Sequence, residues 1–413
     1  TYTAHKKVFI SYDEGKTWKD DGPVPTGAEG DWLDHVIAMD QKDSVIAIGG
    51  TNKGFIVRAA FARADLLAKT SDPGKVNIPV SLKRDIDKGW LGDLYDPKEL
   101  DEPEDILLDG NYAYVPCRGG NNLAVIDISN PRKPALASSF RDPELIEAMG
   151  VSKYKNYIYI SSFSNRKCLV VDAGDPKNLK KIYSFTVGAG GPGADQLRKV
   201  VYHEGYLYLT HDDESKLYIA DARNPARPAI SSSITTGNDG VFAVFIKGNY
   251  AYTGGCFPAN GPVGRSVRVI DIADKRHPKL VSGLIDSARY SCICSFQTRD
   301  DQYLVNVGWM SNSVSVLDIS NPAAPVETGY LRSDLIGWPN RVAVMGNKAY
   351  TINSVSNSLA QIDISSPEKP VIDYIVPSWK LKKGYGIAAK DGLVYMVGRD
   401  SRCFVIVDPS KYE

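Results

Sequence analysis

The stretch Asp127-Ile128-Ser129-Asn130-Pro131-Arg132-Lys133-Pro134 decides the fold, because it recurs along the chain. It returns at 318–325 as DISNPAAP and at 363–370 as DISSPEKP. Weaker copies begin at Asp172, Asp221 and Asp271, and a cut-off copy begins at Asp408. Successive aspartates stand 45 to 50 residues apart, which is the length of one four-stranded blade of a β-propeller.

Short strands precede each copy of this turn. One strand, at 123–126 (LAVI) and 267–270 (VRVI), comes directly before it, and a second, at 112–115 (YAYV) and 250–253 (YAYT), stands earlier. Strands of this length, rich in Val, Ile and Tyr and separated by Gly, Asn, Asp and Pro, are typical of antiparallel sheets. The prolines of the turn fix φ and cannot donate to a sheet, so the chain must leave the sheet there.

Sheets of four such strands bury both faces when they stack around a ring. The sequence therefore predicts one all-β propeller domain over residues 1–413. We expect a degenerate first blade at 32–100 and repeat blades at 101–413, which gives eight blades, or seven if the first unit merges with the end of the chain. The last unit stops at its third strand, so we expect strand 8–11, within residues 1–31, to close the ring.

Composition argues against several kinds of partner. Lys plus Arg and Asp plus Glu both total 49, so the chain lacks the positive field that draws proteins to nucleic acid. No apolar run approaches the length of a membrane span. We also expect the protein to be a monomer. The six cysteines form no CxxC pair, which predicts buried free thiols or, as the alternative, one disulfide between neighbouring blades.

Two motifs carry resemblances to known families. The turn and the strand before it resemble the LVIVD-type repeat of bacterial and archaeal β-propellers, over about residues 100–413. Residues 11–18 (SYDEGKTW) match the Asp-box of sialidase-like propellers, where the box is a structural β-turn. The combination resembles secreted Bacteroides-type glycan enzymes, among them ulvan lyases and enzymes that release L-rhamnose from α-1,4-linked glucuronate in arabinogalactan.

The resemblance implies a function and a location. It implies a carbohydrate-active enzyme that cleaves a uronic-acid-containing polysaccharide, with release of L-rhamnose as the leading activity. It also implies a secreted, periplasmic or cell-surface protein of a bacterium. In the rhamnose-releasing group it implies a catalytic histidine early in the chain, which His35 matches.

The position of the loops predicts a site. Loops that join blades, and loops that join second and third strands, emerge from the same end of the channel, so their polar residues should converge. Arginine pairs with carboxylates, which favours a sugar acid as the ligand. We expect His35, Tyr290 and Arg118 to act in catalysis. The predicted substrate-binding residues are Arg166, His211, Trp309, Asn340, Arg341 and Arg399.

Two reactions are open at such a site. In β-elimination a base, His35 or Tyr290, removes the proton next to the uronate carboxylate while an arginine stabilises the enolate. A hydrolase would use two carboxylates, for which Asp34, Glu104 and Asp239 are candidates; Tyr385 lies in the same loops.

The acidic turn at 211–214 (HDDE) offers oxygen ligands for a structural calcium ion. No other cofactor or metal is expected. The alternative to an enzyme is a non-catalytic cell-surface propeller that binds glycan or protein, because this fold alone does not specify a function.

Overall fold

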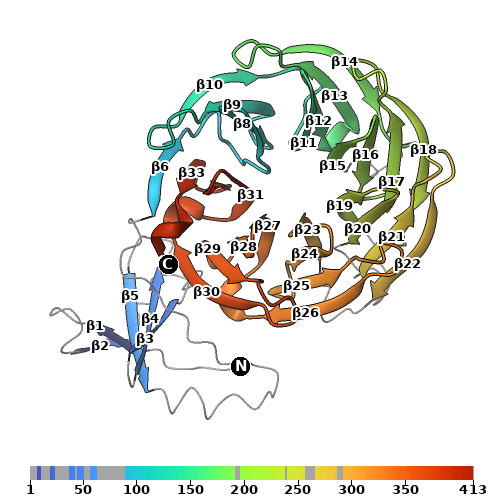
Figure 1. Cartoon of the computed structure of the whole chain (residues 1–413). Helices are drawn as coiled ribbons and strands as arrows, with labels where there is room; N and C mark the ends of the chain where they lie inside the picture. Colours follow the sequence, from blue (N-terminus) through green and yellow to red (C-terminus); the bar gives the residue numbers. More distant parts are fainter. Residues whose placement is uncertain are drawn as a thin grey trace.

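Seven four-stranded antiparallel sheets stand around a central channel (Figure 1). The computed structural model describes residues 89–190, 196–237, 240–255, 266–285 and 292–412, and the backbone of five strands nearer the N-terminus. Within these residues the helical elements are short 3-10 turns such as η1 (Phe163–Asn165). The chain is thus an all-β, seven-bladed propeller. This confirms the predicted fold and the alternative count of seven blades, whereas the favoured count of eight was wrong.

Each blade runs from an inner strand at the channel to an outer strand at the rim. The first three blades are β7 (Leu107–Asp109), β8 (Tyr112–Cys117), β9 (Asn122–Asp127) and β10 (Ala135–Phe140); β11 (Ala148–Tyr154), β12 (Tyr157–Ser162), β13 (Lys167–Asp172) and β14 (Lys180–Thr186); and β15 (Leu197–His203), β16 (Tyr206–His211), β17 (Lys216–Asp221) and β18 (Ala229–Thr235).

The remaining blades follow in the same order. They are β19 (Val241–Lys247), β20 (Tyr250–Gly255), β21 (Ser266–Asp271) and β22 (Lys279–Ile285); β23 (Ile293–Thr298), β24 (Tyr303–Gly308), β25 (Ser313–Asp318) and β26 (Val326–Arg332); β27 (Pro339–Met345), β28 (Lys348–Asn353), β29 (Ser358–Asp363) and β30 (Val371–Pro377); and β31 (Gly384–Lys390), β32 (Leu393–Gly398), β33 (Cys403–Val407) and β6 (Trp90–Tyr95).

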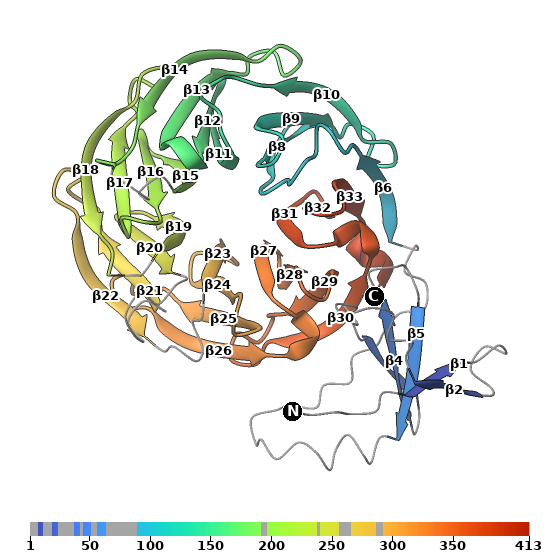
Figure 2. The ribbon, with the colours of Figure 1, turned by 180° about the vertical axis from the view of Figure 1, so that it is seen from behind.

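A strand from earlier in the chain closes the ring, as the cut-off last repeat predicted. That strand is β6, which pairs antiparallel with β33 and places Tyr95 opposite Cys403 (Figure 2). The predicted closing strand 8–11 was wrong, because β1 (Lys7–Ile10) pairs with β2 (Lys19–Pro23) instead. The Asp-box between β1 and β2 lies outside the described residues.

The predicted degenerate first blade does not form as expected. β3 (Ile37–Gln41), β4 (Ser44–Gly50) and β5 (Ile56–Ala62) make a three-stranded sheet that shares no described pairing with the seven blades. The alternation in this segment predicted strands correctly. It could not show which sheet those strands join, because a period of two residues reports local conformation alone.

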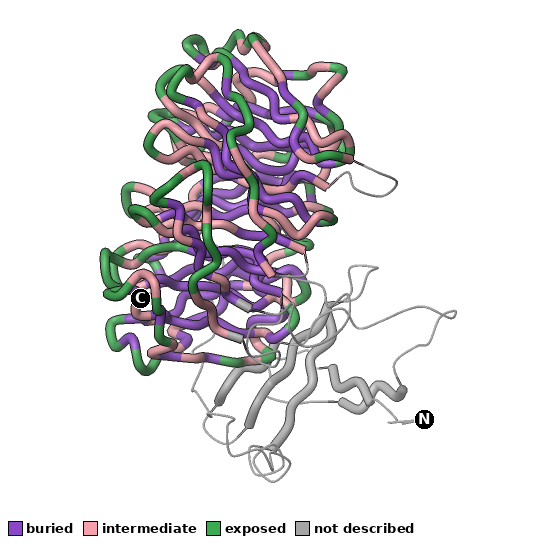
Figure 3. The backbone as a smooth tube through the Cα atoms, turned by 90° about the vertical axis from the view of Figure 1, so that its right-hand side faces the viewer, coloured by how far each residue is buried: buried purple, intermediate pink, exposed green. Residues whose placement is uncertain are grey.

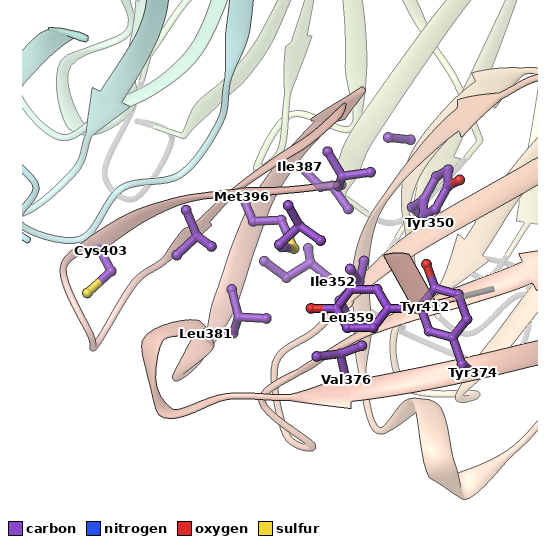
Figure 4. Close-up of a cluster of buried hydrophobic side chains, with 14 residues drawn as sticks. Tyr350, Ile352, Leu359, Tyr374, Val376, Leu381, Ile387, Met396, Cys403 and Tyr412 are labelled. Atoms are coloured by element: carbon purple, nitrogen blue, oxygen red, sulfur yellow. The ribbon is translucent and has the colours of Figure 1, made fainter. Parts of the chain in front are cut away.

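The hydrophobic core lies between neighbouring blades. Figure 3 shows the buried backbone inside the ring and the exposed residues mainly in the turns. Between the sixth and seventh blades, Ile352 packs in one cluster with Ile387 and Met396 (Figure 4). The Tyr374 hydroxyl in this cluster donates to Gln361 Oε1 at 2.8 Å, so its polar atom has a partner.

The repeated turn has the structure that its aspartate dictates. The Asp127 carboxylate accepts the backbone N–H of Ser129 at 2.9 Å, and Asp318 accepts that of Ser320 at 2.7 Å. The copies that begin at Asp172, Asp221, Asp271, Asp363 and Asp408 make the same bond. Except for the copy at Asp408, which follows β33, these Asx turns join third and fourth strands, so they mark the end of the channel that we call the lower end.

A second repeated contact ties blades together at the upper end, where second and third strands are joined. Asn121 Oδ1 accepts the backbone N–H of Glu147 in the next blade at 2.6 Å, and Asn312 Oδ1 accepts that of Trp338 at 2.9 Å. All four residues have positive φ, between 49° and 55°. Asparagine tolerates this conformation and bonds neighbouring backbone, so the contact fixes the chain just before the next inner strand.

Four of the cysteines are free, as the sequence predicts, and one of the described cysteines is in a disulfide. Cys117, Cys168, Cys294 and Cys403 are buried free thiols. Cys292 is disulfide-bonded. Most of the fold therefore depends on packing between blades rather than on covalent cross-links.

Candidate functional site

Strand pairing places one residue from each blade at the same height just inside the upper end of the channel. In every blade the first paired residue of the inner segment lies opposite the last residue of the second strand, as Ala148 does with Ser162 and Pro339 with Asn353. The next residue of each inner segment lies at this height in the channel. We call these seven residues the upper ring: Glu104, Met149, Arg198, Phe242, Cys294, Asn340 and Tyr385.

An outer ring of residues surrounds the upper ring. Each comes directly after the second strand of a blade and donates its backbone N–H to the residue before the inner segment, as Arg399 does to the Lys383 carbonyl at 3.1 Å. The described members are Arg118, Phe163, Asp212, Trp309, Ser354 and Arg399. Both rings hold chemically different residues at equivalent backbone positions, so the repeat itself does not determine their chemistry.

Glu104 is the buried acid of the upper ring. Its side chain is 1% exposed, and burial raises its pKa to about 7, against the opposing charges of Arg399, Arg341, Arg118 and Arg198. Among the described residues neither carboxylate oxygen has a hydrogen-bond partner, although Arg399 Nε lies 3.5 Å from Oε1. Glu104 is therefore a carboxyl group that can exchange a proton near neutral pH.

Three of the four arginines around Glu104 already bind a carboxylate. Arg399 binds Glu102 at 2.6 Å, Arg118 binds Glu147 at 2.8 Å and Arg198 binds Asp212 at 2.7 Å. These ion pairs leave the arginines oriented but largely neutralised.

Arg341 is the exception. It is 9% exposed, and its guanidinium donates to the carbonyls of Cys294 at 3.0 Å and Asn340 at 3.2 Å. It forms no ion pair with a described carboxylate, and its Nε has no hydrogen-bond partner within the described ranges. Its guanidinium also lies 6.0 Å from the ring centroid of Tyr385. A buried cation with carbonyl and aromatic neighbours but without a carboxylate partner among the described residues is suited to receive an anion.

Aromatic rings support the arginines. The Arg198 guanidinium lies 3.6 Å from the ring centroid of Phe242, and Phe163 has Arg118 and Arg198 at 4.9 Å and 5.0 Å. Tyr385 lies beneath Arg399 at 5.2 Å. Because the face of an aromatic ring attracts cations, these contacts hold the guanidinium groups at the mouth of the channel.

A buried ion pair crosses the channel one residue below the upper ring. Lys199 Nζ of the third blade binds Asp105 of the first blade. Burial lowers the pKa of Lys199, and the Asp105 charge opposes that shift. The second blade has Gly150 at this level, where a Cβ would lie 2.6 Å from the Arg198 carbonyl oxygen. The glycine thus allows β11 and β15 to approach closely.

The channel narrows at the upper ring. A space of about 10 Å³ lies among residues such as Arg198, Asn340 and Tyr385, which holds roughly one water molecule. Below it the channel widens to a cavity of about 570 Å³, whose wall includes Lys199, Cys294 and Arg341. We call the upper space the neck; a group that arrives there from the upper end meets Arg341 and Asn340, which line it.

Three segments of the chain match the model of the LVIVD repeat: residues 102–142, 305–332 and 336–376. The chain is a β-propeller with LVIVD repeats. A search of curated proteins found no match to this propeller. Within the described part of the chain no helix is long and apolar enough to cross a membrane.

Solved structures similar to this LVIVD-repeat propeller share its fold at low sequence identity. The WD40 β-propeller domain of Doa1 is 7% identical, with a TM-score of 0.60 over 78% of this chain and 98% of that chain. The Cps50 (Swd1) β-propeller domain of Myceliophteria thermophila is 10% identical, with a TM-score of 0.58 over 78% and 99%. A functionally unknown protein of Desulfotomaculum acetoxidans is 12% identical, with a TM-score of 0.51 over 67% and 90%. These likenesses show the fold alone.

The propeller brings together part of the predicted site. Asn340 lies in the upper ring, Arg341 directly below it, and Arg118, Trp309 and Arg399 in the outer ring. Glu104 and Tyr385 also lie in the upper ring, as the position of their loops in the repeat predicted. His35, Tyr290, Asp34 and Asp239 lie outside the described residues.

Two predicted substrate-binding residues lie away from the channel. His211 is fully buried inside the third blade, 6.0 Å from the Tyr218 ring, and burial lowers its pKa. Arg166 donates to the Gly188 carbonyl at 3.3 Å, in the turn between β12 and β13. The structure does not bring either side chain to the upper ring.

The carboxylates of the acidic turn have internal partners. Asp212 binds Arg198, and Glu214 binds Lys216 at 3.0 Å. No group of three or more His, Cys, Asp or Glu suited to a metal occurs among the described residues. Calcium binding at this turn stays an untested expectation.

Reasoning from the sequence missed Arg198, Lys199, Phe242 and Cys294. They lie in strands, whereas the repeat predicts site residues from its loops. One signal was present: Arg198 and Lys199 are adjacent charges at the start of an otherwise apolar strand, LRKVVYH. Alignment of the repeats on the second residue of each inner strand would have placed them in the channel.

Proposed function

We propose that the upper end of this channel binds the carboxylate of an acidic saccharide. The observation that carries the proposal is Arg341, a buried guanidinium without a carboxylate partner among the described residues, at a mouth where Arg118, Arg198 and Arg399 also gather. A carboxylate matches the planar guanidinium and neutralises its charge.

Neighbouring groups support the same ligand. Asn340 Nδ2 and Arg341 Nε have no hydrogen-bond partner in the described part of the chain, and both are donors. An ionised carboxylate supplies acceptors for both. The neck below them holds about one water molecule, so the acidic group binds at the mouth while the rest of the saccharide lies on the upper face.

The chemistry available here includes acid–base catalysis. Glu104 has a pKa of about 7, which suits proton transfer at neutral pH, and Arg341 would stabilise the negative charge that develops when a proton leaves the carbon next to a carboxylate. These features support cleavage of a uronic-acid-containing polysaccharide. A secreted or cell-surface bacterial enzyme remains part of the proposal through the resemblance to glycan enzymes alone. The resemblance to glycan enzymes favours release of L-rhamnose from rhamnosyl-α-1,4-glucuronate, with His35 and Tyr290 as further candidates.

The test has a binding arm and a product arm. Calorimetric titration with D-glucuronate and with D-glucose measures whether the carboxylate is needed for binding. Arg341→Ala should lose at least tenfold in affinity for glucuronate, whereas Arg132→Ala, a change at an exposed residue of a lower-end turn, should not. Equal weak binding of both sugars by the wild type would refute the proposal. Incubation with gum arabic, followed by ultraviolet absorbance of unsaturated uronate and by assay of free rhamnose, separates lyase from hydrolase.

A non-catalytic propeller is the second candidate. Its supporting observation is an exposed apolar group at the upper end, with Met310, Trp338 and Val355 each 40% or more exposed. Exposed groups of this kind mark docking surfaces. Binding of acidic oligosaccharide without any product from gum arabic would favour this candidate over the enzyme.

A further inference from the structure

Trp338 is an exposed aromatic residue beside the proposed carboxylate site. It comes directly before β27, the strand that carries Asn340 and Arg341. Its side chain is among the exposed large hydrophobic groups. Its ring makes a T-shaped contact with the ring of Trp309, with centroids 4.8 Å apart, and Trp309 lines the neck together with Arg341. The exposed indole therefore lies at the channel mouth on the side of Arg341.

Hydrogen bonds fix the backbone that carries this indole. Trp338 has φ of 55°, which is unfavourable for a bulky side chain. Its N–H donates to Asn312 Oδ1 at 2.9 Å, and its carbonyl accepts the Ser354 N–H at 2.9 Å and the Ser354 hydroxyl at 3.1 Å. Trp309 Nε1 donates to the same hydroxyl at 3.3 Å. Trp338 is thus held in place before any ligand arrives.

The repeat does not require an aromatic residue at this position. The equivalent residues of four other blades, Glu102, Glu147, Cys292 and Lys383, also have positive φ and receive the same backbone bond from the outer ring. None of the four is aromatic. The backbone conformation is therefore general, and the tryptophan is specific to the sixth blade.

We infer that Trp338 stacks on the sugar ring next to the acidic sugar, so that the site recognises an acidic oligosaccharide rather than a single sugar acid. This inference rests on the proposed function and names its substrate class more closely. The C–H face of a pyranose packs against an indole while its hydroxyl groups stay in water, and a fixed aromatic ring binds it at little cost in side-chain entropy. The neck keeps the saccharide on the upper face, where Trp338 is exposed.

Trp379 provides a matched control. It is also an exposed tryptophan of the sixth-to-seventh blade region, at 69% exposure. The next residue, Lys380, binds Asp93 of the outer strand β6 at 2.5 Å, which places Trp379 towards the rim. Substitution of Trp379 removes an exposed indole without touching the neck.

The experiment measures two affinities for each variant by calorimetry. The ligands are D-glucuronate and a rhamnosyl-glucuronate-terminated oligosaccharide from gum arabic. Trp338→Ala should weaken binding of the oligosaccharide about tenfold and change that of glucuronate less than about twofold. Trp338→Phe should restore most of the affinity, and Trp379→Ala should behave as wild type. Thermal melts show that each variant is folded.

The outcomes separate the inference from the proposed function. If the wild type binds both ligands and Trp338→Ala leaves the oligosaccharide affinity unchanged, or weakens both ligands equally, the stacking role is wrong and the carboxylate site stands. If the wild type binds neither ligand, the proposed function fails and the inference fails with it. If Trp338→Ala does not fold, Trp338→Asn decides the matter, because asparagine tolerates a positive φ and removes the aromatic ring. An oligosaccharide affinity about tenfold lower with an unchanged glucuronate affinity supports stacking, and an unchanged oligosaccharide affinity contradicts it.

Discussion

Lys199 of the third blade binds Asp105 of the first blade across the channel, past Gly150 of the second. Both charged side chains are mostly buried, at 18% and 14% exposure. The pair links blades that are not neighbours, and it lies one residue below Glu104, at the level of Arg341. Its integrity therefore affects both the stability of the ring and the shape of the mouth.

Removal of one partner of the Lys199–Asp105 pair should destabilise the folded protein. Lys199→Met leaves Asp105 as a buried charge without its partner, and we expect a loss of about 3 kcal/mol in the free energy of unfolding. The double variant Lys199→Met with Asp105→Leu should regain part of that loss. Chemical denaturation measures both. A single variant as stable as Arg223→Ala, which breaks the exposed pair with Asp221, would contradict a structural role for the buried pair.

Gly150→Ala should disturb the same region by a different route. The new Cβ would meet the Arg198 carbonyl oxygen at 2.6 Å, so β15 must move away from β11 at a cost of about 1 to 3 kcal/mol. Gly174→Ala is the control, because its new Cβ would come no closer than 3.3 Å to a side chain in a lower-end turn. Gly110→Ala would be a poor control because the φ of Gly110 is 54°. Thermal melts that show equal effects of Gly150→Ala and Gly174→Ala would refute the close approach.

Glu104 should make the stability of the ring depend on pH. Its pKa rises from 4.5 to about 7 on folding, so the folded protein holds the proton more tightly than the unfolded chain. The stability from this group is fully present below the unfolded pKa and is lost as the pH rises through about 7. Glu104→Gln stays neutral, so it should be more stable than wild type by about 3 kcal/mol near pH 8.

The same substitution should have little effect near pH 5, where Glu104 is mostly protonated in the folded protein. Denaturation curves at the two pH values test the difference. If the free energy of unfolding changes by the same amount between pH 5 and pH 8 in wild type and in Glu104→Gln, burial does not raise the pKa of Glu104. Asp127→Asn, at an exposed lower-end turn, controls for the general effect of removing a carboxylate.

Truncation should distinguish the two candidate closing strands. A chain that lacks residues 1–20 keeps β6, and its ring should melt at the wild-type temperature because β1 and β2 pair only with each other among the described strands. A chain that starts at Asp96 lacks β6 and exposes the edge of β33, so its melting temperature should fall and aggregation should increase. Equal melting of the two truncated chains would contradict closure by β6.

The sequence predicted the repeat because its turn is chemically specific. Asp127 and its copies accept a hydrogen bond from the backbone N–H two residues later, and prolines end the strand. The turn therefore shows in the sequence where a third strand ends and a fourth begins. The closing strand was misplaced because Trp90–Tyr95 has no such turn before it. A strand completed by a partner hundreds of residues away carries no local sign of that partner.

The site was predicted only at positions that the repeat assigned to loops. Asn340 and Arg341 were assigned to a blade-joining loop although they are the second and third residues of β27, and that loop ends close enough to the channel for the prediction to place them there. Arg198 and Cys294 are second residues of inner strands, and their exposure to the channel depends on the register between strands. His211 was assigned to the loop although it is the last residue of β16, and that one-residue difference turns its side chain into the blade.

The seventh blade joins the two ends of the ring, since β6 at Trp90–Tyr95 pairs with β33 at Cys403–Val407. During synthesis β6 leaves the ribosome long before its partner exists, so the other six blades can assemble while this sheet stays incomplete. Pairing of the two segments must then overcome the entropy of closing a loop that spans the whole ring. We expect pairing of β6 with β33 to be the last step of folding, so the ring is completed only after β33 has been synthesised.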